Sequence, residues 1–266
     1  MAARSIWNGK LELGKTAIGI KLYAAIEDET VHFHLLHATD QERVQQHMLN
    51  PQTGEVRAGD QIRKAYEIKP GTFVLLSAAE LAKLEPSPSK VIEVQRFVPA
   101  AQIEPVWYER PYYVGPVDKS PEYFALARVL GERGLAGVAR WVMRKHAYHG
   151  VLRAHGDYLT LSTLRSAEEV VAAPRVAPAP RAADARELAM AEQLVSALAG
   201  EFDPSEFKDE HRERVLALVA AKAKGKTLKP PPRVRARAPK PLGAALEQSL
   251  KLVQRKPPPE KERLSA

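Results

Sequence analysis

Hydrophobic and polar residues alternate along much of the first 165 residues, in the period-2 pattern of strands with one buried face. Ile18, Ile20 and Leu22 are separated by Gly19, Lys21 and Tyr23. Similar runs occupy residues 73–76, 91–98, 138–143 and 158–164. The Gly156-Asp157 pair, between residues 151–154 and 158–164, predicts a hairpin turn. This part of the chain is therefore predicted to be mainly β.

Two helices are expected to interrupt the strands. Ser77 and Glu80 have the spacing of a capping box, which predicts a helix running to about Leu84. Ser120 and Pro121 begin a second helix, whose predicted apolar stripe before Gly134 consists of Phe124, Ala127 and Leu130. Many strands, few helices and no regular βαβ alternation favour a β-barrel or sandwich with helical additions.

The C-terminal part has a different organisation. Residues 172–183 combine prolines with alanines and arginines and are expected to be a linker. Asp184 and Glu187 predict the start of a helix that Gly200 ends, and Asp203-Pro204 is expected to open a second helical segment. The predicted domains are a core over 1–171, the linker over 172–183, a helical module over 184–222 and a proline-rich tail over 223–266, largely disordered.

Charge is distributed unevenly between the core and the tail. The net charge is +8. Residues 222–266 carry 13 Lys or Arg and three acids, whereas residues 1–221 carry 27 basic and 29 acidic side chains. A basic tail of this kind favours a polyanionic partner such as nucleic acid, and a merely solubilising tail is the alternative. Within the core, residues 133–165 contain six basic residues and one acid, which indicates either a phosphate-binding surface or an ordinary solvated strand face.

Motifs for other chemistry lack their context. Residues 9–16 match the phosphate-binding loop pattern, but no buried strand precedes them and no helix is expected to follow, so a hairpin is favoured. His32 and His34 would share one strand face while His37 points away, which disfavours a metal site. The chain has no cysteine, and no nucleophile elbow was found. We therefore expect no catalysis, cofactor or metal.

An ordered set of short segments resembles the bacterial Ku family. The segments are Arg4–Gly9, Ile20–Tyr23, Phe33–His37, Lys64–Glu67, Pro111–Tyr113, Ala139–Arg144, Gly156-Asp157 and Leu161–Arg165, followed by Ala191–Leu194, Phe202–Pro204, Phe207–Glu210 and Ala221–Lys226. They cover nearly the whole chain in order. Residues 15–19 depart from the family pattern, and this departure creates the match to the phosphate-binding loop. Residues 45–57 also depart from it, so no role is carried onto them.

The resemblance implies a β-barrel core with bridging strands and a few helices, then a small helical module and a disordered basic tail. It implies a homodimeric ring that holds double-stranded DNA ends in non-homologous end joining and recruits a multifunctional DNA ligase. On strand alternation, Arg140 and Arg144 are expected to share a face. The candidate DNA contacts are Arg140, Arg144, Lys145, Arg153, Arg165, Lys222, Lys224, Lys226, Lys229, Arg233, Arg235 and Arg237. The candidate ligase-facing or core-packing residues are Leu188, Leu194, Leu198, Phe202 and Phe207.

Two other functions remain as alternatives: a phosphate-loop nucleotide hydrolase and a general nucleic-acid-coating protein with a basic tail. No apolar run approaches the length of a membrane span, and the first residues lack the apolar stretch of a signal peptide. We therefore expect a cytoplasmic, nucleoid-associated protein that has no membrane partner.

Overall fold

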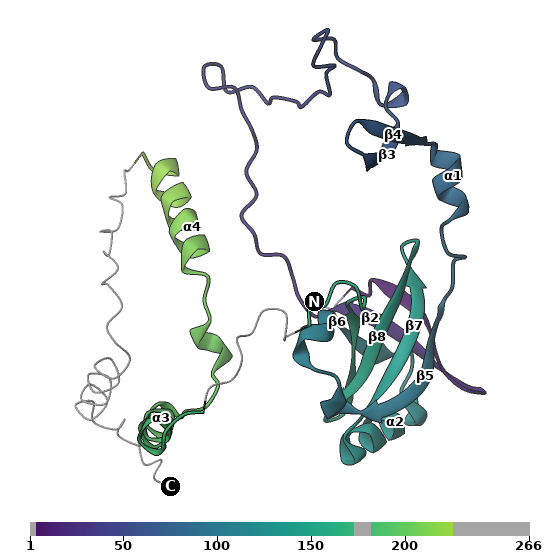
Figure 1. The fold of residues 1–266 in the computed structure, drawn as a ribbon, viewed down its shortest axis with the longest axis vertical. Coiled ribbons are helices and arrows are strands. Elements are labelled where there is room, and N and C mark those ends of the chain that lie inside the picture. Colours follow the sequence, from purple (N-terminus) through teal and green to yellow (C-terminus); the bar gives the residue numbers. More distant parts are fainter. Residues whose placement is uncertain (1–3, 173–181, 226–266) are drawn as a thin grey trace. The chain divides into compact units, whose positions relative to one another are not determined.

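A computed structural model describes residues 4–172 and 182–225 of the chain. The described residues fall into two compact units: residues 4–29 with 33–172, and residues 30–32 with 182–225. The first unit contains a β-barrel and an extended arm, and the second contains two helices (Figure 1).

Seven strands of the first unit close into a barrel. They are β1 (Trp7–Leu13), β2 (Thr16–Ala24), β5 (Val91–Pro99), β6 (Tyr108–Pro116), β7 (Leu135–Met143), β8 (His146–His155) and β9 (Tyr158–Leu164). Their order around the barrel is β1-β2-β6-β9-β8-β7-β5, and all neighbours are antiparallel except β1 and β5. The parallel pairing of Lys10–Leu13 with Val91–Val94 closes the barrel.

Alternating side chains fill the barrel, as the sequence pattern predicts. Ile18, Ile20 and Leu22 are all buried, and the runs predicted at 91–98, 138–143 and 158–164 fall within β5, β7 and β9. Trp141 is the largest of the fully buried side chains, and it packs against Gly150 of β8. A Cβ atom at Gly150 would lie 2.6 Å from the indole and 2.5 Å from the Ser162 carbonyl oxygen, so only glycine fits there.

The Gly9–Thr16 segment is a hairpin and not a phosphate-binding loop. Gly9 lies within β1, and Leu13 pairs with Thr16 across a tight turn in which Gly14 has a φ of 63°. The segment that follows is strand β2 and not a helix, so the structure confirms the predicted hairpin. The turn at Gly156-Asp157 is confirmed as well, because His155 pairs with Tyr158 and Gly156 has a φ of 59°.

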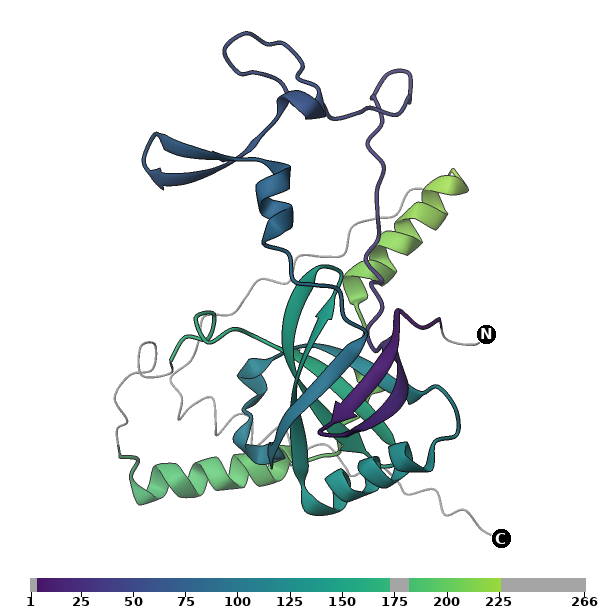
Figure 2. The ribbon, with the colours of Figure 1, turned by 90° about the vertical axis from the view of Figure 1, so that its right-hand side faces the viewer.

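Helix α2 (Pro121–Arg133) lies at one end of the barrel (Figures 1 and 2). It follows Ser120 and stops at Gly134, as predicted, but the predicted stripe was wrong at one position. Tyr123 is buried in place of Phe124, which is 45% exposed. The Tyr123 hydroxyl donates a hydrogen bond to the Val114 carbonyl and accepts one from the Leu159 backbone N–H, 2.9 Å away, so it joins β6 to β9. We call this end of the barrel the helix end.

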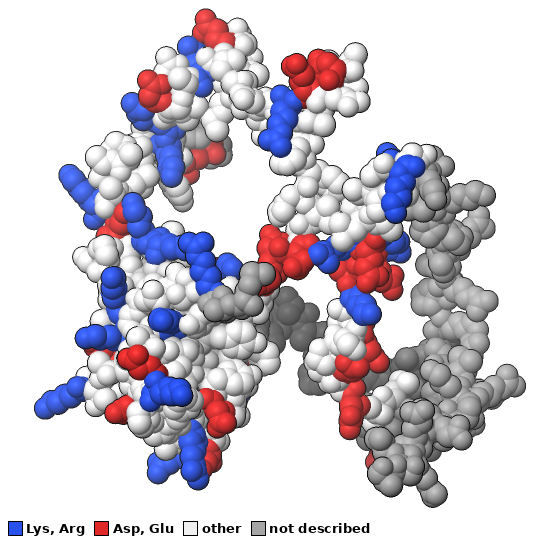
Figure 3. Space-filling model, turned by 180° about the vertical axis from the view of Figure 1, so that it is seen from behind, with Lys and Arg blue, Asp and Glu red and all other residues white. Residues whose placement is uncertain are grey.

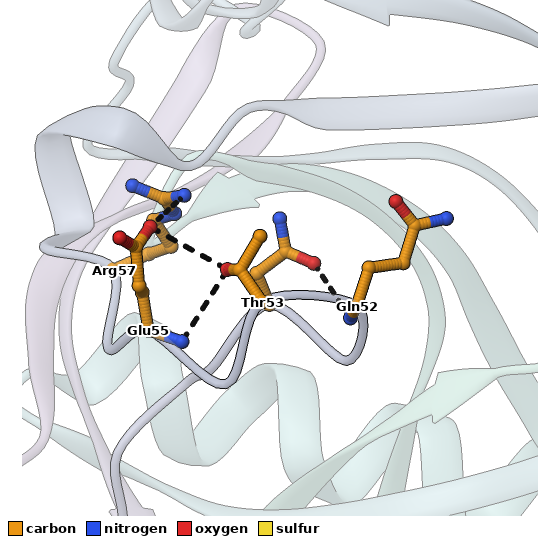
Figure 4. Close-up of polar contacts among 5 residues, drawn as sticks. Gln52, Thr53, Glu55 and Arg57 are labelled. Carbon is orange, nitrogen blue, oxygen red and sulfur yellow. Dashed lines mark hydrogen bonds and ion pairs between the residues drawn. The ribbon is translucent and has the colours of Figure 1, made fainter.

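An arm, residues 33–90, connects β2 to β5. It contains the two-stranded sheet β3 (Lys64–Lys69) and β4 (Thr72–Leu76), then helix α1 (Ala78–Lys83). Both sides of the predicted capping box form, because Ser77 and Glu80 each accept a hydrogen bond from the other's backbone N–H. Elsewhere the arm is irregular but locally bonded: Figure 4 shows the turn at Gln52–Arg57, where Arg57 lies 2.6 Å from Glu55.

The second unit contains helices α3 (Ala185–Leu198) and α4 (Glu210–Ala223). The capping box of Asp184 with Glu187 forms as predicted. The second helix begins later than predicted: Asp203-Pro204 opens only a 3-10 turn, and Asp209 caps α4 by accepting a hydrogen bond from Arg212 N–H. In the described part of the chain, we found no helix long and apolar enough to cross a membrane.

Candidate nucleic-acid interface

The arm joins the barrel at the end opposite α2, which we call the arm end. The strand register shows this directly: Ala24, where β2 ends, pairs with Tyr112, and Val91, where β5 begins, pairs with Lys10 near the start of β1. The same end carries the turn between β7 and β8, the start of β6 and the end of β9. Sequence segments that are far apart therefore meet where the arm leaves and returns.

Arg144 and Lys145 form the turn between β7 and β8 at the arm end. Met143 pairs with His146, so these two residues are the whole connection, and their φ angles are 50° and 68°. Asparagine and glycine are preferred at such positions, because other residues pay a steric cost there. The expectation that Arg144 shares a strand face with Arg140 was wrong, since the strand ends at Met143 and alternation stops with it.

Two of the candidate residues make ion pairs with glutamates. Arg140 lies on the outer surface of the barrel, 3.0 Å from Glu93 of the neighbouring strand. Lys145 lies 2.9 Å from Glu85, in the segment by which the arm returns to the barrel. All four side chains are at least one third exposed, so these ion pairs are screened by solvent and leave the basic groups available to a competing anion.

The remaining core candidates lie beside aromatic residues. The Arg153 guanidinium lies 5.8 Å from the centre of the Tyr108 ring, which holds this half-buried side chain against the barrel wall. Arg165 follows β9 directly, is exposed, and donates a backbone hydrogen bond to the Trp107 carbonyl. Arg144, Lys145 and Arg165 thus all lie at the arm end, whereas Arg140 projects from the outer wall.

Arg110 belongs to the same end, although the sequence reasoning missed it. Its guanidinium lies 5.9 Å from the centre of the buried Tyr112 ring. Burial raises the pKa of Tyr112 above its usual value of 10.0, and the positive charges of Arg110 and Arg144 act in the opposite direction. The available signal was a single arginine, Arg110, among the tyrosines of the Tyr108–Tyr113 segment.

The barrel surface carries charges of both signs. Figure 3 shows Lys and Arg spread over the visible face of the barrel, with Asp and Glu among them. The basic residues on such a surface can contact a phosphate backbone, and contacts of that kind carry no sequence information. Across the described residues, no three His, Asp or Glu side chains group as metal ligands would, and His37 instead pairs with Asp40 at 2.8 Å.

The other candidates lie in the second unit or beyond the described chain. Lys222 and Lys224 are exposed at the end of α4. Lys226, Lys229, Arg233, Arg235 and Arg237 lie outside the described residues. The aromatic rings of Phe202 and Phe207 pack together, 5.1 Å apart between centres, yet remain 77% and 72% exposed. Leu188 and Leu198 are also exposed, whereas Leu194 is half-buried.

Comparison with known proteins gives consistent matches. Residues 12–191 match the family model described as the Ku70/Ku80 beta-barrel domain. The chain is 33% identical to the non-homologous end joining protein Ku 2 of Geotalea uraniireducens over 255 residues, covering 95% of this chain and all of that protein. It is 35% identical to the non-homologous end joining protein Ku of Anaeromyxobacter sp. over 233 residues, which cover 86% of this chain and 78% of that protein. The non-homologous end joining protein Ku of Coxiella burnetii is 31% identical, and the match covers 86% of each chain.

Proposed function

The chain belongs to the Ku family, and from this membership we propose that it binds the ends of double-stranded DNA in non-homologous end joining. The observation that carries the proposal is the arm end of the barrel. There both roots of the arm lie at the same end of the barrel as the basic residues Arg110, Arg144, Lys145 and Arg165. An arm anchored beside a basic surface can enclose a duplex whose phosphates that surface neutralises.

The arm also supports a homodimer. Its two-stranded sheet exposes apolar side chains on both faces: Tyr66 is 68% exposed on one, and Phe73 and Leu75 are 59% and 68% exposed on the other. A two-stranded sheet alone is marginally stable in water, so a partner surface is needed to cover it. A second copy of the chain would supply that surface and would turn two arms into a closed ring.

Binding through a ring makes the topology of the DNA decisive. Backbone contacts carry no sequence information, so we expect sequence-independent affinity that falls steeply with salt. A ring can be threaded only onto a free end. The proposal assigns binding to the protein and no catalytic step.

The test compares gel shifts on linear duplex and on covalently closed circular duplex of equal length and sequence. We expect binding to the linear form only, and equal affinity for both forms would refute the proposal. A variant lacking residues 223–266 separates a ring from a coating protein: a ring keeps its preference for ends, whereas a protein that coats DNA through its tail loses nearly all binding.

We further propose that the second unit binds a DNA ligase. Its exposed apolar side chains, including Leu188, Leu198, Phe202 and Phe207, form the kind of surface that a partner protein buries. Leu194 is half-buried, which suits packing within the unit. Replacing Phe202 and Phe207 with serine is expected to abolish stimulation of end ligation while leaving DNA affinity unchanged. Undiminished stimulation would exclude this surface as the ligase site.

A further inference from the structure

A cavity of about 850 Å³ lies at the arm end, between the start of β1, the turn of β7 and β8, and the returning segment of the arm. Its lining includes Trp7, Glu85, Lys90, Arg144 and Lys145. The proposed function uses Arg144 and Lys145 of this lining for contacts with the DNA backbone, but it assigns no ligand to the cavity itself. It is of the size of small-molecule sites and far larger than a single inorganic anion requires.

The polar lining of this cavity has the chemistry of a phosphate site. Two basic residues, Lys90 and Arg144, contribute to it together with the hydroxyl-bearing Ser5, Ser87 and Ser89. Lys145 is paired with Glu85, the acid of the lining. Within residues 4–172 and 182–225, no hydrogen bond or ion pair engages the Arg144 guanidinium or the Lys90 ammonium group. Both charges are therefore free to bind an anion.

The apolar lining gives room for more than a phosphate group. Ile6, Met143 and the partly buried indole of Trp7 belong to the same wall. An indole face beside a basic group is a surface on which a nucleobase or a sugar packs while the phosphate reaches the cation. The combination of cavity volume, indole and free cations fits a phosphorylated nucleoside better than a bare anion.

The backbone at Arg144 gives an independent indication that this side chain is positioned for binding. Its φ of 50° is a costly conformation for arginine in a two-residue turn where asparagine would fit without strain. Lys145 shares this turn with a φ of 68°, so the turn fixes both basic side chains at the wall of the cavity.

From these observations, we propose that the cavity binds a nucleoside 5′-monophosphate group, with Arg144 and Lys90 holding the phosphate and Trp7 contacting the nucleoside. A phosphate monoester carries nearly one charge more than an internal phosphodiester, so the site favours a terminal phosphate over the backbone. The group could be the 5′ end of a DNA strand or a free nucleotide. The first source rests on the proposed function, and the second does not.

The test measures fluorescence anisotropy with two blunt duplexes that differ only in a 5′-phosphate or a 5′-hydroxyl group. The full-length protein is expected to bind the phosphorylated duplex about tenfold more tightly, which is the effect of one charge-assisted hydrogen bond. Arg144→Asn should reduce this ratio to about one, and Lys90→Gln should lower it. Asparagine tolerates the backbone of the turn, so loss of folding is not expected to confuse the result.

Arg140→Gln is the matched control, because Arg140 lies on the outer wall and is absent from the cavity lining. It should leave the ratio of the two affinities unchanged. Calorimetric titration tests whether the site binds a free nucleotide. It compares deoxyadenosine 5′-monophosphate with deoxyadenosine, which lacks the phosphate. The site would be assigned to free nucleotides if the nucleotide binds saturably, if Arg144→Asn abolishes that binding, and if the protein does not discriminate between the two duplexes.

The proposal is overturned if the protein neither distinguishes the duplexes nor binds the nucleotide. It is equally overturned if a preference for phosphorylated ends survives both substitutions. These outcomes are separate from a failure of the proposed function. If the protein still prefers linear over circular duplex, only the cavity proposal falls; if it binds both equally, end binding falls with the DNA-end source.

Discussion

The ammonium group of Lys145 lies 2.9 Å from the carboxylate of Glu85, and this ion pair links the β7–β8 turn to the segment by which the arm rejoins the barrel. The side chains are 71% and 37% exposed, so the pair contributes little to stability. Under the proposed function its main effect is electrostatic, because the Glu85 carboxylate competes with a DNA phosphate for the Lys145 ammonium group.

Glu85→Gln is expected to strengthen DNA binding. The substitution removes a negative charge beside the proposed interface and leaves Lys145 unpaired, so affinity should rise several-fold at low salt and the gain should shrink as salt increases. The free energy of unfolding should change by less than about 1 kcal/mol. Anisotropy titrations across a salt series, with denaturant melts alongside, measure both quantities. Unchanged or weaker binding would show that Lys145 does not contact DNA.

Replacing the turn Arg144-Lys145 with Asn-Gly is expected to separate stability from binding. Asparagine and glycine adopt the positive φ angles of this turn at little cost, so the double variant should gain about 1–2 kcal/mol in stability. It also loses two charges at the arm end, so DNA affinity should fall. Thermal unfolding and fluorescence anisotropy, measured on the same preparation, test whether stability rises while DNA affinity falls. A variant that loses stability and binding together would indicate a structural role for the two side chains.

Arg165→Gln is expected to reduce the salt dependence of DNA binding. Each phosphate contact adds about one unit to the slope of log affinity against log salt concentration, and loss of one contact should lower the slope by that amount. Arg128 on α2 provides the matched control, because it is equally basic but pairs with Glu132 on the helix that lies at the other end of the barrel. Arg128→Gln should leave the slope unchanged. A similar fall of the slope in both variants would show that the effect comes from the net charge of the protein and not from a phosphate contact of Arg165.

Local sequence signals predicted the local structure of this chain well. The alternation at Ile18, Ile20 and Leu22 and the capping box of Ser77 with Glu80 depend on neighbours in sequence, and both are confirmed. Closure of the barrel through β1 and β5 depends on residues about 80 positions apart, which no local pattern records. Strand β6 was also not identified from its pattern, because Pro111 and Pro116 are unfavourable signals for a strand.

The candidate site was harder to predict than the fold, because its geometry depends on where strands end. Extending β7 by one residue placed Arg144 on a strand face, whereas the turn in fact begins there. Tyr123 and Phe124 are both compatible with the apolar stripe of α2, and only contact with β6 and β9 selects Tyr123. Arg110 could be identified as a candidate only once the structure showed that β6 starts at the arm end.

Tyr123→Phe is expected to destabilise the barrel by about 1–3 kcal/mol. The substitution removes a buried hydroxyl that bonds to both Val114 and Leu159, and it leaves those backbone groups without that partner. Tyr113→Phe is the matched control, since Tyr113 lies on β6 next to Val114 and its side chain is 46% exposed. Denaturant unfolding at neutral pH measures both effects. Equal effects would show that the Tyr123 hydroxyl has no special role.

The same residue predicts how stability depends on alkaline pH. Burial raises the pKa of Tyr123 above 10.0, so the folded state holds this proton more tightly than the unfolded state does. The associated stability is complete below about pH 10 and is lost as the pH rises through the pKa of the folded protein. Tyr123→Phe should therefore show a shallower loss of stability above pH 10 than the unsubstituted protein. Parallel pH profiles would exclude Tyr123 as a source of that loss.

The β3–β4 sheet of the arm should determine the oligomeric state. Phe73 and Leu75 lie on one face of β4, both more than half exposed, and a sheet of two strands cannot bury them itself. Replacing both with serine removes the apolar area that a second copy would cover, at little cost to a barrel they do not help to fill. The double variant is expected to be monomeric by light scattering, with a barrel that unfolds at an unchanged temperature.

Val129→Ser is the control for this substitution, because Val129 is 47% exposed on α2 and lies outside the sheet. It should remain dimeric. The monomeric variant should also lose its preference for linear over circular duplex, since one arm alone cannot close a ring, while weak salt-sensitive binding through the barrel persists. If the double variant stays dimeric, another surface of the chain forms the interface. If it becomes monomeric yet still distinguishes ends, a single chain is sufficient to recognise them and the ring is unnecessary.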